Sequence, residues 1–347
     1  MRKKSVNSKK YKMPLKRRIV SFLCIFYIVG FCLFLFLFYG PINSFKEFWI
    51  TSAMTTMNHR YLATWFYSDE YIQKVLKNNS IIEVDEVSDP NQIKFRKYSS
   101  SIYKNKYEKD ILDRDKDDLY KVIEVSGSGY QGYLVAVYDP SRISIATTAY
   151  LGVRGESILT VSKRENAIIA MNAGGFYDPD WNSNGALPHG TVISNGKVVS
   201  DYVDANMGGG FIGFTNENKL ILGNMSKEEA VKTGYRDAIE FGPYLIVNGK
   251  RSFIKGNGGW GRAPRTAIGQ RSDGIVLFVV INGRLANSIG ADMVDLTDIM
   301  ENYGAVNAAN LDGGSSSELV INNKIINTPV AGGENGLRNM STFWVVK

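Results

Sequence analysis

The chain of 347 residues contains only two cysteines and two histidines. Two cysteines exclude a disulfide scaffold, and so few histidines exclude a zinc site built mainly from histidine. Glycine is missing altogether from residues 41–126, although the chain holds 34. Apolar residues make up 44% of the sequence, which excludes a wholly disordered protein. The length suffices for one large domain or two ordinary ones with additional segments.

The formal net charge of +7 comes from the first eighteen residues. That segment holds nine basic residues and no acidic one, so the rest of the chain has 32 basic against 34 acidic residues. A body that is slightly acidic has no electrostatic bias towards polyanions. We therefore predict that the protein has no nucleic-acid partner.

A run of 21 uncharged residues, 19–39, follows the basic tail. As a helix this run would be about 31 Å long, which matches the hydrocarbon thickness of a bilayer. We interpret 19–40 as a transmembrane anchor, with the tail 1–18 in the cytoplasm and the remainder outside the cell membrane. The run exceeds the usual apolar region of a signal peptide, and Gly40-Pro41 is a poor cleavage context, so an anchor is favoured over a cleaved signal.

Composition divides the exported chain in two. Residues 41–118 lack glycine and are rich in charge, and we interpret them as a membrane-proximal helix at 45–76 followed by a charged stalk. Residues 119–347 are glycine-rich and form the main domain. Three aromatic residues of the first part could either lie at the lipid interface or pack on the main domain: Trp49, Trp65 and Phe66.

From residue 119 onward, short apolar runs alternate with tight turns. Asn-Gly or Asp-Gly between apolar runs is the strongest short hairpin signal, and it occurs within 191–200, 244–253 and 269–284. Helices are predicted at 156–165, 226–233 and 292–303, the second with a Ser-x-x-Glu capping box. We predict an α+β fold of mainly antiparallel, hairpin-rich sheets with a few helices, preceded by one transmembrane helix.

The residues that could carry chemistry lie at the ends of predicted strands. An apolar run ends in the sequence Asn172-Ala-Gly174-Gly175-Phe-Tyr-Asp178. The two glycines would let a ligand approach the backbone closely. The alternative is a bulged turn capped by Asn172 and Asp178.

Three further residues lie in comparable positions. His189 is the only histidine of the main domain, and a lone histidine is more often structural than catalytic. Glu240 precedes a Gly-Pro turn. Arg265 opens a strand with Thr266, and a guanidinium there is costly unless it meets a carboxylate or a phosphate. We therefore favour a pocket role for Arg265 over a surface salt bridge.

The most informative segment comes directly after the third predicted helix. It reads Asn310-Leu-Asp312-Gly313-Gly314-Ser315-Ser316-Ser-Glu. A strand that ends in this way presents a carboxylate beside successive backbone N–H groups, which suits a phosphate oxygen. The alternative is that Asp312-Gly313 is one more hairpin turn. Arg338 precedes the last predicted strand.

Taken together, these motifs resemble the phosphodiester glycosidase family. The resemblance is carried by Asn-Ala-Gly-Gly-Phe from 172, Arg-Thr-Ala-Ile-Gly from 265 and Asn-Leu-Asp-Gly-Gly-Ser-Ser-Ser from 310. It runs from about residue 166 to the end of the sequence, and more weakly back to 122. The family includes the animal "uncovering enzyme", an N-acetylglucosamine-1-phosphodiester α-N-acetylglucosaminidase, and bacterial members associated with the envelope or with exopolysaccharides.

The resemblance implies a hydrolase that cleaves the C1–O bond of a sugar-1-phosphodiester in an envelope or exopolysaccharide glycan. Such cleavage builds positive charge on the sugar ring while a phosphate departs, so the site needs a carboxylate near C1 and cations or N–H donors at the phosphate. Asp312 is the first candidate for that carboxylate, as nucleophile or as base, and Glu240 is the second. His189 would orient the sugar or the departing oxygen.

The phosphorylated glycan would be bound by Asn172, Gly174, Gly175, Asp178, Arg265, Thr266, Asn310, Gly313, Gly314, Ser315, Ser316 and Arg338. A divalent cation, Ca²⁺ or Mg²⁺ held by Asp and Asn oxygens, is an open option for a cofactor, although no loop has an EF-hand pattern. Two alternatives to the hydrolase stay open, a non-catalytic module that binds phosphorylated glycans and an ordinary glycoside hydrolase. The sugar, the group beyond the phosphate, the stereochemical outcome and the oligomeric state are left undetermined.

Overall fold

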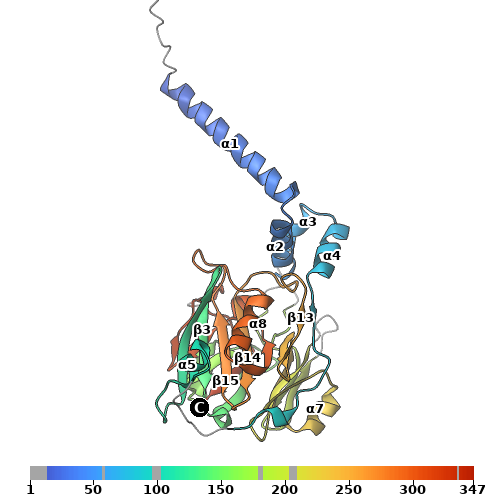
Figure 1. Cartoon of the computed structure of the whole chain (residues 1–347), viewed down its shortest axis with the longest axis vertical. Coiled ribbons are helices and arrows are strands. Elements are labelled where there is room, and N and C mark those ends of the chain that lie inside the picture. The colour runs from blue at the N-terminus through green and yellow to red at the C-terminus, as the bar shows by residue number, and fades with distance from the viewer. Residues whose placement is uncertain (1–13, 57–58, 96–102, 179–182, 203–208, 334–335) are drawn as a thin grey trace, which may run out of the picture. The chain divides into compact units, whose positions relative to one another are not determined.

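The computed structural model describes residues 14–56, 59–95, 103–178, 183–202, 209–333 and 336–347 (Figure 1). These residues belong to two compact units, 1–49 and 50–347. The strand pairs within the described residues are antiparallel, and helices accompany them, so the predicted α+β class is confirmed. Of the predicted basic tail, residues 1–13 lie outside the described part of the chain.

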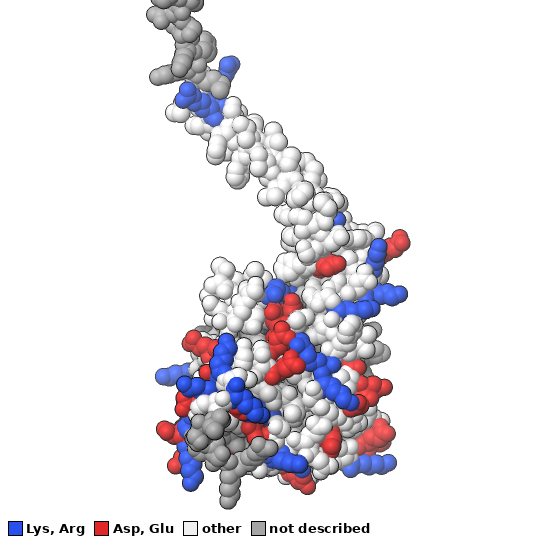
Figure 2. Space-filling model, in the orientation of Figure 1, with Lys and Arg blue, Asp and Glu red and all other residues white. Residues whose placement is uncertain are grey.

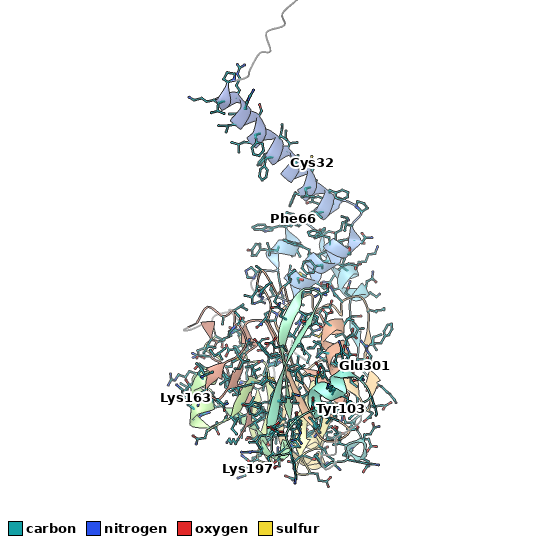
Figure 3. The ribbon with its side chains drawn as sticks, turned by 60° about the vertical axis from the view of Figure 1, so that its left-hand side comes forward. Cys32, Phe66, Tyr103, Lys163, Lys197 and Glu301 are labelled. Atoms are coloured by element: carbon teal, nitrogen blue, oxygen red, sulfur yellow. The ribbon has the colours of Figure 1, made fainter. Side chains whose placement is uncertain are left out.

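The first unit contains the helix α1 (Leu15–Tyr39) and the start of α2 (Asn43–Met54). Within the described residues, α1 is the one helix that is long and apolar enough to cross a membrane. Lysine and arginine gather at its first turn (Figure 2), and Cys32 lies exposed along it (Figure 3). At its end Phe38 contacts Trp49, with ring centroids 4.9 Å apart. Such a helix near the N-terminus is either a signal sequence or a membrane anchor.

The second unit begins with a small cluster of helices, consisting of the end of α2, α3 (Tyr61–Thr64) and α4 (Asp69–Asn78). The predicted helical run at 45–76 is therefore interrupted. Helix α4 begins where the hydroxyl of Ser68 accepts a hydrogen bond from Tyr71 N at 3.3 Å. The cluster has its own apolar core of Ile50, Ala53, Ala63, Ile72 and Val75.

A glycine-rich loop, 256–261, attaches this helical cluster to the sheets. Asn257 N donates to the Asn79 side chain at 3.0 Å, and Asn257 Nδ2 donates to the Thr51 hydroxyl at 2.8 Å. A Cβ atom on Gly261 would lie 2.5 Å from Ser52 Cα, and the φ of Gly261 is +54°. Only glycine permits this approach, because it lacks a side chain and adopts positive φ without strain.

Three sheets form the body of the second unit, with a two-stranded ribbon of β1 (Ile81–Ile82) and β13 (Phe253–Ile254) beside them. The seven-stranded sheet is ordered β12 (Lys250–Arg251), β11 (Tyr244–Val247), β16 (Ala305–Asn310), β14 (Arg265–Arg271), β15 (Val276–Ile281), β3 (Tyr130–Val137) and β2 (Tyr120–Gly127). The β6–β10 sheet is ordered β7 (Lys197–Tyr202), β6 (Gly190–Ser194), β10 (Tyr235–Phe241), β8 (Gly210–Thr215) and β9 (Leu220–Gly223). The β5–β19 sheet is ordered β18 (Lys324–Ile325), β17 (Leu319–Ile321), β5 (Ile169–Asn172), β19 (Thr342–Val346) and β4 (Ile143–Thr147).

The inner faces of the three sheets enclose one common core. Phe278 of the seven-stranded sheet, Phe214 of the β6–β10 sheet and Trp344 of the β5–β19 sheet all belong to it. Helices cover the outer faces: α8 (Met293–Asn302) and α5 (Lys106–Leu112) on the seven-stranded sheet, α6 (Ile158–Arg164) on the β5–β19 sheet, and α7 (Lys227–Thr233) on the β6–β10 sheet. Short 3₁₀ turns occur at Pro90–Gln92, Pro140–Arg142 and Gly314–Ser316.

The local sequence signals for turns and caps are confirmed. Asn195-Gly196 and Asn248-Gly249 have positive φ at both residues, as two-residue hairpin turns require. The capping box of Ser226 and Glu229 begins α7. Helix α5 lies within the predicted stalk, and the predicted domain boundary at residues 118–119 stays a prediction.

The shared core generates a prediction about stability. Trp344 is 0% exposed and meets Phe214 edge-on, with centroids 5.5 Å apart, whereas Trp65 is 73% exposed. Trp344→Ala should lower the free energy of unfolding by about 3–5 kcal/mol, because it leaves a large cavity. Trp65→Ala, the matched control, should change it by less than about 0.5 kcal/mol. Chemical denaturation of the full chain in mild detergent, followed by circular dichroism, measures both, and equal effects would contradict the common core.

Candidate active site at the strand ends

The strand register brings the ends of several strands to one edge of the body. Arg265, at the start of β14, lies opposite Ile281 at the end of β15, and Asn310, at the end of β16, lies opposite Ala267. In the β5–β19 sheet, Asn172 ends β5 opposite Phe343, near the start of β19. The loops that follow or precede these ends therefore meet near Asn172, Arg265 and Asn310.

The buried side chain of Asn172 joins the seven-stranded sheet to the β5–β19 sheet at this edge. Its Nδ2 donates to the carbonyl of Asp312 at 2.6 Å. Its Oδ1 accepts from the Thr266 hydroxyl at 2.9 Å and from Glu318 N at 3.1 Å. Because the amide is engaged at both ends, Asn172 and Thr266 hold the loop after β16 in place rather than pointing towards solvent.

Residues 312–318 form a connection between two sheets and not a hairpin. Strand β16 pairs with β14 and β11, whereas β17 pairs with β5 and β18, so the hairpin alternative for Asp312-Gly313 is wrong. Gly314 has φ +62°, and Gly314–Ser316 form a short 3₁₀ turn. We call Asp312, Gly313–Ser316, Asp178, Glu318 and Arg338 the strand-end site.

Asp312 is the carboxylate at the centre of this site. Burial raises its pKa to about 6, although the Ser316 hydroxyl, the charge of Arg338 and the Gly313 N–H each favour the ionised form. The Gly313 N–H donates to Oδ1 at 3.0 Å. The negative charge of Asp178 also raises the pKa of Asp312. A carboxyl group of this kind is ionised at neutral pH and accepts a proton readily just below it.

Buried Asp178 and half-buried Arg338 form an ion pair beside Asp312. The other oxygen of Asp178 accepts a hydrogen bond from Ser183 N at 2.6 Å. The guanidinium of Arg338 lies 4.6 Å from the centre of the Phe176 ring. Two of the predicted binding residues, from the loop after β5 and the loop before β19, are thus brought together.

Glu318 is a second carboxyl group in the site, and the sequence argument did not single it out. Its side chain is fully buried, Oε1 accepts a hydrogen bond from Arg338 N at 2.8 Å, and Oε2 has no partner. Burial raises the pKa of Glu318 to about 8, against the lowering effect of the Arg338 N–H and charge. Glu318 therefore holds a proton at neutral pH while Asp312 does not, and carboxyl groups with separated pKa values are typical of acid–base sites.

Arg265 is buried directly behind the loop that contains Gly313. Its guanidinium donates to the carbonyls of Ala291 at 3.1 Å, Trp260 at 2.5 Å and Gly261 at 2.6 Å. Burial lowers its pKa to about 10, against the favourable charge of Asp292. Arg265 is thus neither a surface salt bridge nor an unengaged cation, because backbone carbonyls of the glycine-rich loop hold it.

Arg284 is a cation near the site that no sequence motif indicates. It ends the predicted 269–284 hairpin segment. A Cβ atom on Gly314 would lie 3.3 Å from Arg284 Nη2. Partial burial and the charge of Arg338 lower the pKa of Arg284. Its positive φ of +58° is the one local unusual feature, and the sequence did not reveal it.

The remaining predicted residues lie at the border of the strand-end site. Glu240 follows Ile239, which faces the common core, so alternation along β10 directs Glu240 to the other face of its sheet, where it lies over Gly190. His189 is buried, and its backbone N–H donates to the carbonyl of Gly175 at 2.9 Å. Gly174 N donates to the Thr342 hydroxyl at 3.1 Å. Among the described residues, no hydrogen bond or ion pair joins Glu240 to Asp312, and the roles of Glu240 and His189 stay predictions.

Asn310 connects the site to the β6–β10 sheet. Its Nδ2 donates to the carbonyl of Gly242 at 2.9 Å and its N–H to that of Pro243 at 3.0 Å. Within the described residues its Oδ1 is buried without a hydrogen-bond partner.

In the described part of the chain, no group of three or more His, Cys, Asp or Glu side chains is arranged to hold a metal ion.

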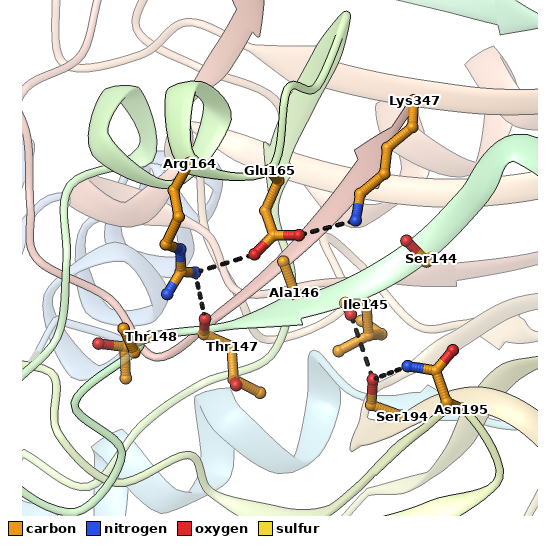
Figure 4. A pocket seen from close by; sticks show the side chains of 11 residues that line it. Ser144, Ile145, Ala146, Thr147, Thr148, Arg164, Glu165, Ser194, Asn195 and Lys347 are labelled. Atoms are coloured by element: carbon orange, nitrogen blue, oxygen red, sulfur yellow. Dashed lines mark hydrogen bonds and ion pairs between the residues drawn. The ribbon is translucent and has the colours of Figure 1, made fainter.

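A cavity of about 290 Å³ lies elsewhere, between β4, the end of α6 and the turn that follows β6 (Figure 4). None of the predicted site residues lines it. Its two cationic side chains, Arg164 and Lys347, both pair with Glu165, at 3.4 and 2.7 Å. Because its charges are satisfied internally, this cavity offers less to an anionic ligand than the strand-end site.

Comparison with known proteins identifies a family for this chain. A family model described as phosphodiester glycosidase matches residues 165–347. The SPbeta prophage-derived uncharacterized protein YomE of Bacillus subtilis (strain 168) is 31% identical over 199 residues, which are 55% of this chain and 30% of that protein. The chain thus spans less than a third of the length of this relative.

Solved structures show a similar fold. The catalytic domain of zebrafish N-acetylglucosamine-1-phosphodiester alpha-N-acetylglucosaminidase, auto-inhibited by its pro-peptide, superposes with a TM-score of 0.54 at 19% identity. The match covers 67% of this chain and 85% of the zebrafish chain. A putative exported protein of Burkholderia pseudomallei K96243 gives a TM-score of 0.44 at 18% identity, covering 62% and 74%.

The buried Glu318 generates a prediction about pH and stability. Its pKa is higher in the folded state than in the unfolded chain, so the folded state binds more protons between about pH 4.5 and 8. The stability of the wild type should therefore fall as pH rises through this range, by up to about 1.4 kcal/mol per pH unit. Glu318→Gln should remove this contribution, and its advantage over the wild type should grow with pH. Denaturation curves at several pH values measure it, with exposed Glu301→Gln as control; parallel curves would contradict the prediction.

Proposed function

Because the chain belongs to the phosphodiester glycosidase family, we propose that it is a hydrolase that cleaves the C1–O bond of a sugar-1-phosphodiester. The products are a free sugar and a phosphate monoester. N-acetylglucosamine-1-phosphodiester is the first substrate to test, because the zebrafish protein of similar fold bears that name. The predicted position outside the cell membrane suggests an envelope or exopolysaccharide glycan as its source.

The observation that carries the proposal is the placement of Asp312. Its carboxyl group has a pKa raised to about 6, accepts a hydrogen bond from the Gly313 N–H and lies near the Asp178–Arg338 pair. A carboxylate that stabilises positive charge at C1 needs to be ionised, and a departing phosphate needs a cation nearby. The strand-end site contains such a carboxylate beside such a cation.

In the proposed mechanism, the Asp312 carboxylate acts at C1. It either attacks C1 to form a glycosyl ester, which water then hydrolyses to the free sugar, or takes a proton from the water that attacks C1 directly. In both cases the C1–O bond electrons pass to the departing phosphate. A phosphate monoester is a stable anion, so the departing oxygen needs little help from a general acid. Arg338 stabilises the charge on the phosphate, because the N–H groups of Gly313, Gly314 and Ser316 already donate to Asp312, Pro264 and Gly313.

The neighbouring residues support this chemistry indirectly. Asn172 and Thr266 fix the backbone of Asp312, and Asp178 orients Arg338. Arg265 contributes positive charge behind the glycine–serine loop, although its own donors are directed at carbonyls. We therefore propose that these four are positioning residues for Asp312 and Arg338.

We also propose that α1 is retained as an anchor. Its basic first turn favours a cytoplasmic start, which would leave residues 41–347 on the outer side. The site would then act on glycans within reach of the membrane.

The first test is substitution of the central carboxylate. Asp312→Asn should lower kcat/KM for an N-acetylglucosamine-1-phosphodiester by about 10³-fold or more, because the amide can neither attack C1 nor accept a proton. For the wild type, kcat/KM should rise as pH increases through about 6, since the ionised carboxylate is required. Release of free sugar is the measurement.

Asp298→Asn provides the matched control. Asp298 lies on α8 and pairs with Arg251 of β12, away from the site. Full turnover by Asp312→Asn would overturn the central assignment. Binding of phosphorylated glycan without any release of sugar by the wild type would indicate a non-catalytic module. Equal cleavage of an aryl glycoside without phosphate would indicate an ordinary glycoside hydrolase.

The anchor is tested by fractionation of cells that produce the full chain. The protein should stay in the membrane fraction after washing at alkaline pH and should keep its full mass. A version without residues 1–40 should be released by the same wash. A shortened, soluble product of the full chain would instead identify the apolar helix as a cleaved signal sequence.

A further inference from the structure

Arg284 differs from the other cations of the site in having no internal partner. Among the described residues, its guanidinium makes neither a hydrogen bond nor an ion pair. Arg338 is paired with Asp178, and Arg265 donates to three carbonyls. Arg284 is also exposed, so a ligand can reach it.

The guanidinium of Arg284 lies over the glycine–serine loop. A Cβ atom on Gly314 would come within 3.3 Å of Nη2 and 3.8 Å of Cζ. The N–H of Gly313 donates to Asp312. The N–H of the next residue, Gly314, donates to the Pro264 carbonyl at 2.8 Å. Arg284 therefore faces the same loop as Asp312 but comes from a different strand end.

The backbone around Arg284 is held firmly. Arg284 N donates to the Ile289 carbonyl at 3.0 Å, and the Ser288 hydroxyl donates to the Asn282 carbonyl at 2.7 Å. The Asn282 side chain accepts from Thr328 N at 2.8 Å. A guanidinium on a fixed loop loses little conformational entropy when it binds, so the position is suited to a ligand.

Three guanidinium groups lie close enough here to influence one another. The charge of Arg284 lowers the pKa of Arg265, and the charge of Arg338 lowers that of Arg284. The Asp178 carboxylate pairs with Arg338, so it does not occupy the donors of Arg284. A guanidinium is the group that best matches the geometry of phosphate oxygens, and among the described residues the donors of Arg284 are not used by the protein.

We propose that Arg284 binds the phosphate group of the substrate beside Gly314 of the Gly313–Ser316 loop. The assignment rests on the proposed function. It makes Arg284 a determinant of specificity, because it provides a charged, forked donor that a substrate without phosphate does not need. Asp312 still acts at C1, where the glycosidic bond is broken, and Arg284 binds the departing phosphate.

The experiment compares Arg284→Gln, Arg284→Lys and a control, Arg251→Gln, in the full chain in mild detergent. Arg251 is suitable because it lies on β12 and pairs with Asp298 and Glu301. The measurements are kcat/KM for an N-acetylglucosamine-1-phosphodiester, and inhibition constants for inorganic phosphate and for free N-acetylglucosamine. Phosphate reports on the anion subsite and the neutral sugar reports on the rest of the site.

Arg284→Gln should lower kcat/KM by about 10- to 100-fold and raise the inhibition constant of phosphate by a similar factor, as expected for loss of a charge-assisted hydrogen bond. Inhibition by the neutral sugar should stay within about twofold, a change too small to signal loss of an interaction. Arg284→Lys should fall between wild type and Gln, because it keeps the charge but loses the fork. Arg251→Gln should match the wild type.

Two results would overturn the assignment while leaving the proposed function intact: an unchanged inhibition constant for phosphate in Arg284→Gln, or equal weakening of phosphate and neutral sugar. If the wild type released no sugar at all, the proposed function would fail and calorimetry with inorganic phosphate would decide about Arg284. Binding that weakens in Arg284→Gln but not in Arg251→Gln would still support an anion site. No binding would overturn both.

Discussion

The amide of Asn172 is the contact on which the geometry of the strand-end site depends. It ends β5, yet it holds the backbone of Asp312 and the hydroxyl of Thr266, which belong to the seven-stranded sheet and its following loop. An amide can do this because it donates and accepts at once, whereas a carboxylate could not donate to the Asp312 carbonyl. The position of the proposed catalytic carboxylate is thus fixed from two sheets by one side chain.

Around that fixed point, the structure concentrates groups that do not favour folding. Glu318 is buried with one oxygen unpartnered, Asp312 is shifted towards the neutral form, and three arginines lie near one loop. Buried ionisable groups generally cost stability, and they persist where the surrounding packing holds them. Here the common core of three sheets and its outer helices supply that packing.

The sequence predicted those parts of the molecule whose cause is local. Asn-Gly turns, the Ser226 cap and the buried run before Asn172 depend on neighbours in the chain, and each appears where the pattern indicated. The sequence also placed the candidate polar residues at strand ends, where Asn172, Arg265 and Asn310 lie. Glu318 and Arg284 were missed because their roles depend on distant partners. Nothing near Arg284 in the sequence reveals that Gly314 would lie beside it.

Arg265 also shows that the sequence does not identify the partners of a buried side chain. Its position at a strand entrance correctly indicated that its charge would be buried, but not what would neutralise it. The partners are carbonyls of Trp260, Gly261 and Ala291, and glycine-rich loops offer carbonyls that no residue-type pattern identifies. The helical run at 45–76 was likewise interrupted, since helix α4 starts at its own cap.

The glycine-rich loop 256–261 contacts two parts of the structure. Its Asn257 donates to Thr51 and Asn79, and Gly261 packs against Ser52. Its carbonyls also accept hydrogen bonds from Arg265. Residues 51–79 are therefore joined to the loop that holds Arg265. An insertion between α2 and α4 would act on that loop, and through it on the support of the strand-end site.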